Sequence, residues 1–282
     1  MNLKTKIIKI EGKSSEAFFQ NLITNDIKLL ENNQALYSAM LTPQGKFLAD
    51  FILIKDLNFL FFEVNKNNAE ELVNLIKKYD LRKSLKISIQ EKMKTYFILY
   101  KKTPLNIINK IKKIKILKEN ESFMFFDPRK DNFLLRIWSY GESLNSLPQE
   151  LDLSISEKTL NLERIKNSVP DSSIDLEKEK SFILNYNFDA LNAISFTKGC
   201  YIGQENTSRQ NYRGKIKYIL KTIKLIEGKF PQPHETLFFK NQKIGTMKSH
   251  VENYGLALLR TDFFEVNKEF SLDKFDAKLL VI

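Results

Sequence analysis

Short runs of alternating apolar and polar residues cover much of the first ninety positions, and two segments that read as helices interrupt them. Alternation with period two indicates a half-buried strand, whereas apolar residues three and four positions apart indicate an amphipathic helix. The predicted strands cover 7–12, 36–54, 57–64 and 81–90, and the predicted helices cover 15–23 and 68–80. A turn at Pro43-Gln44-Gly45 divides the second run into two strands. The order strand, strand, helix, strand is typical of a ferredoxin-like half.

A second set of elements follows, and its slight residue identity with the first suggests a pseudo-duplication. Its predicted strands cover 94–100, 123–128 and 132–140, its helix covers 104–113, and a further helix covers 154–167. After residue 215 the segments become short and alternating, which is typical of a small barrel. We predict an α+β protein. Its body (1–214) has two ferredoxin-like halves, about 1–94 and 95–214, whose interleaving is left open, and a C-terminal β-barrel covers 215–282.

Composition is ordinary for a soluble globular protein of 282 residues, with 43% hydrophobic and 28% charged residues. No apolar stretch approaches the roughly 20 residues that a membrane span needs, so we expect no membrane association. The basic N-terminal stretch lacks the apolar region of a secretory signal. A single cysteine excludes an internal disulfide and favours a reducing compartment. These features together predict a cytoplasmic location.

The net charge of +11 raises the question of an anionic partner. Only seven of the 45 basic residues are arginine, and the lysines are scattered along the whole chain. The densest basic run, 110–118, has no interleaved aromatic residues that could stack on bases. A general bias towards lysine explains the charge more simply than direct tRNA binding does.

The usual catalytic and metal-binding motifs do not occur. His234 and His250 have no second histidine or cysteine at metal-ligand spacing, which argues against a zinc site. The sequence has neither a GxSxG elbow nor a P-loop. One thiolate cannot hold an iron–sulfur cluster alone, because such clusters usually take four cysteine ligands. Cys200 can therefore be at most one transient cluster ligand among several.

Cys200 lies in an unusually polar stretch, SFTKGCYIGQENTSRQNYRGK at 195–215. Lys198, together with Arg209 if the following segment is helical, would favour the reactive thiolate. Gly199 and Gly203 allow a sharp turn or a close approach of the backbone to a ligand. From the residues alone, a functional thiol and an inert buried cysteine in a glycine turn both remain open.

The string KGCYIGQE, residues 198–205, resembles the signature of the YgfZ family, the folate-binding relatives of the glycine-cleavage T-protein. That family includes the mitochondrial factor for late assembly of [4Fe-4S] proteins. Further blocks resemble the family in the same order along nearly the whole chain. They contain Thr24, Asn25 and Asp26; Pro43, Gly45 and Asp50; Tyr79, Arg82 and Ile87; Arg164 and Pro170; and Gly245, Ser249 and Arg260.

Two departures from the T-protein pattern bear on the reaction. T-protein relatives carry a pterin-contacting glutamate where this chain has Lys166. The motif that carries the catalytic aspartate of the T-protein is not found. Both departures argue against aminomethyl transfer, so the resemblance does not imply a classical enzyme.

The resemblance implies a T-protein-like folate-binding body, a small barrel and a role in the assembly or repair of [4Fe-4S] clusters. The tRNA link is then indirect, through radical enzymes that modify tRNA. The implied cofactor is tetrahydrofolate or a derivative, with a transient cluster shared with a partner. The implied partners are cluster carrier proteins and recipient enzymes. The alternatives are a tetrahydrofolate-dependent aminomethyl- or methyltransferase, and a module that docks tRNA or protein without using the cysteine.

The resemblance also implies roles for individual residues. Cys200 is the functional thiol, and Lys198 lowers its pKa electrostatically. The implied cofactor-binding residues are Asn25, Asp26, Arg164, Gly199, Tyr201, Gly203, Gln204, Glu205 and Arg209.

Overall fold

A computed structural model describes residues 5–214, 216–263 and 265–282. The chain forms two compact units, each built from separated segments. Unit 1 comprises the described residues of Met1–Leu41, Leu48–Ile155 and Leu191–Ile202, and unit 2 comprises Thr42–Phe47, Ser156–Ala190 and the described residues of Gly203–Ile282. The division of the chain at 214 and 215 stays a prediction, and Lys215 itself lies outside the described residues.

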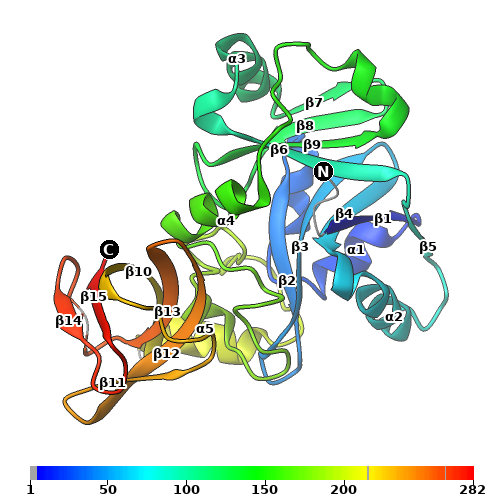
Figure 1. The fold of residues 1–282 in the computed structure, drawn as a ribbon. Helices are drawn as coiled ribbons and strands as arrows, with labels where there is room; N and C mark the ends of the chain where they lie inside the picture. The colour runs from blue at the N-terminus through cyan, green and yellow to red at the C-terminus, as the bar shows by residue number, and fades with distance from the viewer. Residues whose placement is uncertain (1–4, 215, 264) are drawn as a thin grey trace. The chain divides into compact units, whose positions relative to one another are not determined.

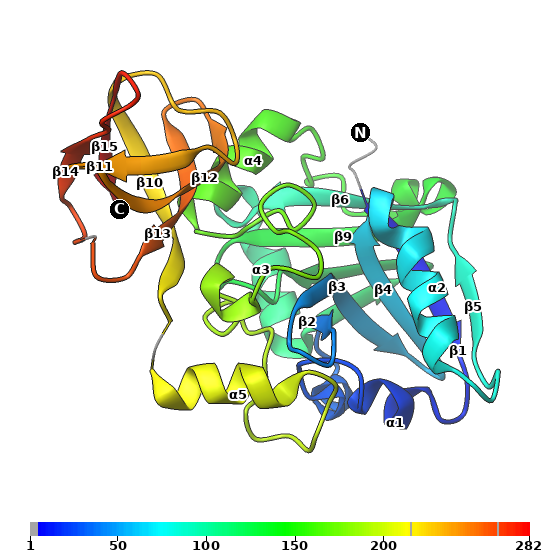
Figure 2. The same cartoon turned by 90° about the horizontal axis from the view of Figure 1, so that it is seen from below.

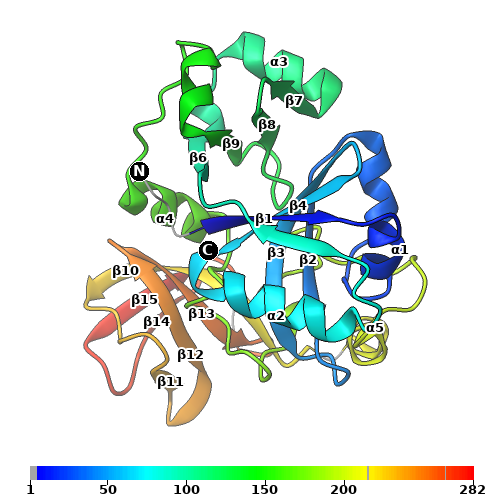
Figure 3. The ribbon, with the colours of Figure 1, turned by 90° about the vertical axis from the view of Figure 1, so that its right-hand side faces the viewer.

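The first part of unit 1 is an antiparallel sheet covered by helices (Figure 3). Its order is β2-β3-β4-β1-β5. The strands are β1 (Thr5–Glu11), β2 (Leu36–Leu41), β3 (Phe47–Asp56), β4 (Phe59–Asn65) and β5 (Lys86–Ile89), and the helices are α1 (Ser15–Gln20), η1 (Ile27–Asn32), η2 (Lys66–Asn68) and α2 (Ala69–Tyr79). Helix α2 buries Ala69, Leu72, Val73 and Ile76, four of the residues whose spacing predicts this helix.

The second part of unit 1 is a four-stranded sheet of order β6-β9-β8-β7 with α3 beside it (Figure 1). Its elements are β6 (Met93–Leu99), η3 (Tyr100–Lys102), α3 (Leu105–Ile114), β7 (Ile116–Glu119), β8 (Ser122–Phe126), β9 (Leu134–Tyr140) and η4 (Gly141–Ser146). Strand β7 was not predicted, because three of its four residues lie inside the basic run 110–118, which shows no clear alternation. Ile107 and Ile111 of α3 pack with Ile98, Leu135 and Ile137 of the sheet.

Unit 2 consists of three short helices and a curled antiparallel sheet of order β11-β12-β13-β10-β15-β14 (Figure 2). Its elements are α4 (Glu157–Lys166), η5 (Ile183–Tyr186), α5 (Gln204–Arg213), β10 (Tyr218–Gly228), β11 (Thr236–Phe239), β12 (Gln242–Val251), β13 (Tyr254–Arg260), β14 (Glu269–Ser271) and β15 (Ala277–Val281). Lys240 and Asn241 both have positive φ. They form the tight turn that joins β11 to β12 in an antiparallel hairpin. The predicted α+β class with a C-terminal barrel of strands is confirmed.

Candidate functional site

Residues 195–202, the part of the Cys200 stretch that lies in unit 1, are bonded at both ends to the segment that precedes η1. The backbone N–H of Ser195 donates to the carbonyl of Thr24 at 3.0 Å, and that of Ile202 donates to the carbonyl of Asn21 at 3.1 Å. Two blocks that are about 170 residues apart in the sequence therefore form one structure in unit 1. The loop around Cys200 is held at both ends.

Lys198 is the buried anchor of this loop, with 8% of its surface exposed. Its Nζ donates to the carbonyls of Ile23 at 2.8 Å and Asn25 at 2.7 Å. Burial lowers the pKa of Lys198 to about 8, and the nearby Asp26 carboxylate acts in the opposite direction. The ammonium thus fixes the loop to the 23–25 backbone. Its effect on the thiol stays a prediction.

Cys200 and Gly199 are exposed, whereas the residues on either side of them are buried. Tyr201 is 6% exposed, and its ring centroid lies 5.2 Å from Nζ of Lys198. Lys198 and Tyr201 point into unit 1, so the loop presents the thiol to solvent. The burial assumed by the inert-cysteine alternative is therefore not observed, and whether the thiol is functional stays a prediction.

Asn25 and Asp26 hold the neighbouring turn together. The Asn25 amide donates to the carbonyls of Tyr37 at 2.9 Å and Asn192 at 2.7 Å. The Asp26 carboxylate accepts from the backbone N–H of Lys28 and so caps η1. Both side chains support the turn that holds Lys198, and their predicted cofactor contacts stay predictions.

Gly203 begins α5 in unit 2 with a φ of 83°, a left-handed conformation that favours glycine. The segment after Gly203 is helical, which is the condition under which Arg209 was predicted to favour the Cys200 thiolate. Glu205 and Arg209 are exposed on α5, and Gln204 is half-buried. By contrast, Gly199 has no positive φ, and a Cβ there would meet open space. Of these two positions, only Gly203 has a backbone conformation that requires glycine.

The predicted turn at Pro43-Gln44-Gly45 packs against the start of α5, also within unit 2. The Asn206 amide donates to the carbonyl of Gln44 at 2.7 Å. Gly45 has a φ of 75°, and a Cβ there would lie 3.1 Å from the carbonyl oxygen of Gly203. Two family blocks distant in sequence therefore meet here and fix the start of α5.

Arg164 of α4 is buried in unit 2 and makes a full set of contacts there. Its guanidinium donates to Asp175 Oδ2 at 3.0 Å, to Ser249 Oγ at 2.9 Å and to Asn161 Oδ1 at 2.9 Å. It also donates to the carbonyl of Val169 at 3.4 Å. These contacts give Arg164 a structural role, and its predicted contact with a cofactor stays a prediction.

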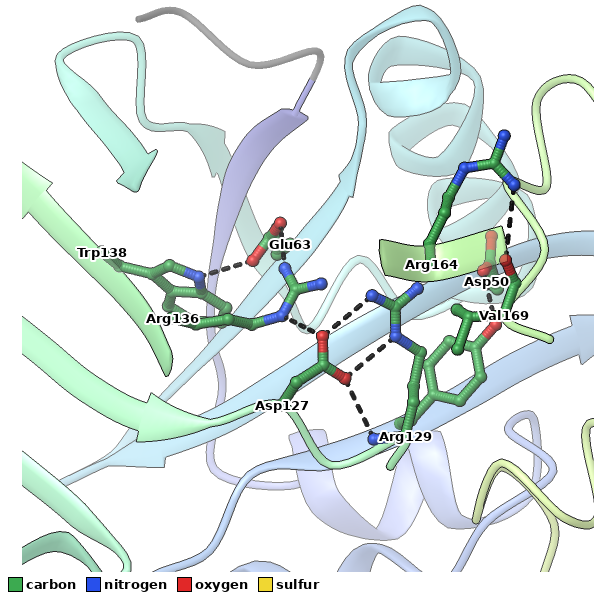
Figure 4. A network of polar contacts seen from close by, with 9 residues as sticks. Asp50, Glu63, Asp127, Arg129, Arg136, Trp138, Arg164 and Val169 are labelled. Carbon is green, nitrogen blue, oxygen red and sulfur yellow. Dashed lines mark hydrogen bonds and ion pairs between the residues drawn. The ribbon is translucent and has the colours of Figure 1, made fainter. Parts of the chain in front are cut away.

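The structure also contains a buried charge cluster in unit 1 that sequence reasoning missed (Figure 4). We define the charge cluster as Glu63, Asp127, Arg129, Arg136 and Trp138. Arg136 donates to Glu63 at 2.6 Å and to Asp127 at 2.8 Å, Arg129 donates to Asp127 from Nε and Nη2, and the Trp138 indole donates to Glu63 at 2.6 Å. Burial alone would raise the pKa of Asp127, but Arg129 and Arg136 hold it well below its usual range.

Beside this cluster, Tyr37 and Asp50 form a second polar pair. The Tyr37 hydroxyl donates to Asp50 Oδ2 at 2.7 Å, and the Tyr37 ring centroid lies 5.6 Å from the guanidinium carbon of Arg129. Burial, and then the Asp50 carboxylate, raise the pKa of Tyr37 well above its ordinary value, so the phenol stays protonated. Asp50 is half-exposed. The sequence signalled Asp50 through its family block, but nothing in it signalled Tyr37 or Arg129.

Comparison with known proteins first defines the class. The chain resembles the crystal structure of the glycine cleavage system aminomethyltransferase T from Bartonella henselae with a TM-score of 0.77 and 14% identity, covering 99% of this chain and 82% of that one. The family model for the CAF17 C-terminal beta-barrel domain matches residues 218–281. The fold is therefore that of the T-protein class, and its final strands form a CAF17-type barrel.

Sequence relatives then define the family. The "tRNA-modifying protein YgfZ" of Hamiltonella defensa is 30% identical over 224 residues, which are 76% of this chain and 66% of the relative. The "Iron-sulfur cluster assembly factor IBA57 homolog, mitochondrial" of Neurospora crassa is 29% identical over 238 residues, which are 80% of this chain and 54% of the relative. This chain belongs to the YgfZ family, together with its IBA57 homologues.

The matched region spans about half to two thirds of the length of these relatives. The relatives from Neurospora crassa, Coccidioides immitis and Dictyostelium discoideum are all named mitochondrial, which contradicts the predicted cytoplasmic location. That prediction was wrong because a single cysteine indicates a reducing compartment without specifying which one. Within the described residues, no helix is long and apolar enough to cross a membrane.

Proposed function

We propose that this protein is a folate-binding accessory factor for the assembly or repair of [4Fe-4S] clusters in recipient proteins, and that Cys200 is its functional thiol. The exposed Cys200 on an anchored loop carries the proposal. The thiolate is the form that binds metals, and an exposed thiol can reach a cluster on another protein. The names of the IBA57 relatives support the same process.

Cys200 would bind the cluster transiently, while the cluster is transferred to a recipient protein. One thiolate supplies one of the four ligands that a cluster usually takes, so a carrier or recipient protein supplies the others. Forming the iron–thiolate bond releases the thiol proton. Lys198 keeps the loop in place while this happens, because its two carbonyl contacts prevent the backbone around Cys200 from moving away. The partners are therefore cluster carriers and [4Fe-4S] enzymes.

The polar groups of the described residues fit a reduced folate in part. Asp50 offers a half-exposed carboxylate, the kind of acceptor that the amino edge of a pterin needs, and Arg129 beside it offers a fixed positive charge. The T-protein glutamate position does not fit, because Lys166 occupies it and places its Nζ 4.8 Å from the Tyr254 ring centroid. We therefore assign recognition of the pterin ring to Asp50. A folate bound there would supply a carrier of one-carbon units. The link to tRNA modification then runs through the clusters of radical enzymes.

The test is the activity of a [4Fe-4S] enzyme such as aconitase in cells depleted of this protein and complemented with variants. We expect wild type to restore aconitase and Cys200→Ala to leave it at the depleted level, while a [2Fe-2S] enzyme stays unchanged throughout. Thr197→Ala is the matched control, because Thr197 is an exposed residue of the same loop and is expected to complement fully. Both variants should melt at the wild-type temperature, since neither side chain is buried.

Two outcomes would reject the proposal. Full rescue by Cys200→Ala would leave a docking module that does not use the thiol. Unchanged aconitase on depletion would reject cluster assembly, and turnover of tetrahydrofolate would then be assayed with Asp50→Asn. The Asp50–Tyr37 pair is the observation that favours this transferase alternative, because it supplies the half-exposed carboxylate that the chemistry needs.

A further inference from the structure

The segment from η3 to β7 carries the strongest local charge of the chain. Residues 100–118 contain seven lysines and no aspartate or glutamate, although acidic residues make up 34 of the 282 in the whole sequence. Among α1 to α5, α3 has basic residues and no acidic one within the described chain. A uniform bias towards lysine does not remove acidic residues from one segment. The segment therefore needs a separate explanation.

Helix α3 separates its two kinds of residue between two sides. Ile107, Ile108 and Ile111 are buried on one side. Lys112 and Lys113 are exposed, and so is Lys115 directly after the helix. Since the apolar side of α3 is already packed on its own sheet, the charged side is the surface that this helix offers to a partner.

Internal ion pairs use only part of this charge. Lys110 pairs with Glu119 at 2.9 Å, and Lys118 pairs with Asp56 at 2.7 Å. Lys112, Lys113 and Lys115 have no carboxylate partner among the residues that the structure describes, and we call these three the lysine face. The Lys112 Nζ lies 5.6 Å from the ring centroid of Tyr100, which itself packs on Phe126.

Helix α2 provides an internal reference, because it also packs its apolar side on a sheet of unit 1. It also ends with two lysines, Lys77 and Lys78, but begins with Glu70 and Glu71. In both helices, lysines in the last turn interact favourably with the negative end of the helix dipole. The glutamates at the start of α2 interact favourably with its positive end. Helix stability therefore explains the lysines in the last turns and does not explain the missing acidic residues of α3.

The chemistry of the lysine face selects among anionic partners. Protein interfaces are enriched in arginine and depleted in lysine, whereas lysine serves well as a point charge for phosphate. An anionic membrane would be bound most strongly by a helix with an apolar side to insert, and that side of α3 is buried. Among the residues that the structure describes, the aromatic ring recorded near these lysines is Tyr100, and it packs on Phe126 rather than standing free for base stacking. Among these anionic partners, the phosphate backbone of nucleic acid, bound without regard to base sequence, fits the lysine face best.

We propose that the lysine face of α3 binds the phosphate backbone of nucleic acid. Binding through phosphates releases counterions, so the affinity falls steeply with salt and depends little on base sequence. This contact is separate from cluster assembly at Cys200.

The test measures fluorescence anisotropy of labelled RNA and DNA duplexes of matched sequence with the full-length protein at several salt concentrations. The variant is Lys112→Gln/Lys113→Gln/Lys115→Gln. The control is Lys66→Gln/Lys77→Gln/Lys78→Gln, which removes the same charge from exposed positions on η2 and α2. We expect the α3 variant to lose at least about tenfold in affinity at low salt, with a salt slope lower by about 2–3, and the control to change less than about twofold.

Equal losses in the two variants would overturn the proposal, because net charge alone would then explain binding. Absence of binding by wild type would overturn it as well. Vesicles of phosphatidylcholine with phosphatidylserine form the third arm, and binding to them but not to either duplex would assign the face to membranes instead. A difference between the RNA and DNA arms identifies the natural source of the phosphate. The α3 variant should still restore aconitase in depleted cells, which separates this proposal from the role of Cys200.

Discussion

The charge cluster of unit 1 and the Arg164 site of unit 2 both bury an arginine against a carboxylate, yet they are built differently. In the charge cluster, Arg136 bridges two acidic side chains, Glu63 and Asp127, which come from β4 and from the loop after β8. In unit 2, Arg164 meets one carboxylate, Asp175, which also accepts from backbone N–H groups. The first site relies mostly on side chains that pair with each other, with one backbone donor, the N–H of Arg129, to Asp127. The second has one such side-chain pair and two backbone donors to Asp175.

This difference indicates which substitution should reduce the stability most. A buried carboxylate that loses its cationic partner, as Glu63 would lose Arg136, keeps most of its desolvation cost, whereas a carboxylate that retains two backbone donors is still partly satisfied. The charge cluster also connects the two sheets of unit 1, because Glu63 lies on β4 and Arg136 on β9. We therefore expect stability to depend more on Arg136 than on Arg164.

The largest effect is expected for Arg136→Met. The substitution nearly keeps the volume. Among the described residues it leaves Glu63 with the Trp138 indole as its side-chain donor, and it takes one of the two arginines from Asp127. We expect a loss of about 4–5 kcal/mol in the free energy of unfolding. Trp138 is the only tryptophan and contacts Glu63, so its fluorescence during urea unfolding reports on this site directly.

Lys118→Met is the matched control for that measurement. Lys118 pairs with Asp56 at 2.7 Å in the same unit, but 44% of its side chain is exposed. A surface pair contributes at most about 1 kcal/mol, so this variant should unfold close to wild type. If Arg136→Met loses no more than Lys118→Met, the charge cluster does not connect the sheets.

A smaller loss, about 3 kcal/mol, is expected for Arg164→Met. Asp175 would keep the N–H groups of Ser249 at 2.8 Å and Asp171 at 2.8 Å, which limits the cost. Hydrogen exchange of the β12 amides measures the loss locally, because Ser249 lies on that strand. Lys158→Met, which breaks an exposed pair with Glu252, is the control on the same helix.

The Arg164 variant also separates two views of this residue. Family resemblance implies a cofactor contact, whereas its hydrogen bonds imply a structural role. Unchanged protection of β12 together with weakened folate binding would refute the structural view and reverse the comparison. A faster exchange of β12 supports it.

The sequence predicted the repeating elements well and the charge cluster not at all. Periodicity reports which residues of a segment face inwards, so the helices at 68–80 and 104–113 and the barrel strands could be predicted. It does not report which inward residues face each other. Glu63 and Arg136 are 73 positions apart, and each reads as an ordinary polar residue in an apolar strand.

The candidate site was predictable to the extent that its chemistry is local. Cys200, Lys198 and Gly203 lie within six residues, and the motif indicated a shaped loop. The motif did not reveal that Lys198 points inwards to carbonyls of the 23–25 segment, because that contact depends on the tertiary fold. Tyr37 and Arg129 have no sequence signal for the same reason.

Lys198 is a third kind of buried cation, because the hydrogen bonds of its ammonium go to carbonyls rather than to carboxylates. Its pKa in the fold is about 8, below the value of about 10.4 for an unfolded lysine. The unfolded chain then holds this proton to higher pH, so stability rises as the pH increases through this window. We expect the free energy of unfolding to gain about 2 kcal/mol between about pH 7.5 and 9.5 relative to Lys198→Met, in which the gain is absent.

The measurement is urea unfolding of both proteins across that pH range, with the difference between them plotted against pH. Lys248→Met is the second control, because Lys248 is also a buried lysine whose pKa is lowered by burial, but it lies in unit 2. Trp138 fluorescence follows unit 1, so a change specific to Lys198 should appear in this signal. A difference that does not change with pH would show that Lys198 keeps its ordinary pKa. The carbonyls of Ile23 and Asn25 would then stabilise its charge as fully as water does, and a buried cation would not need a carboxylate partner.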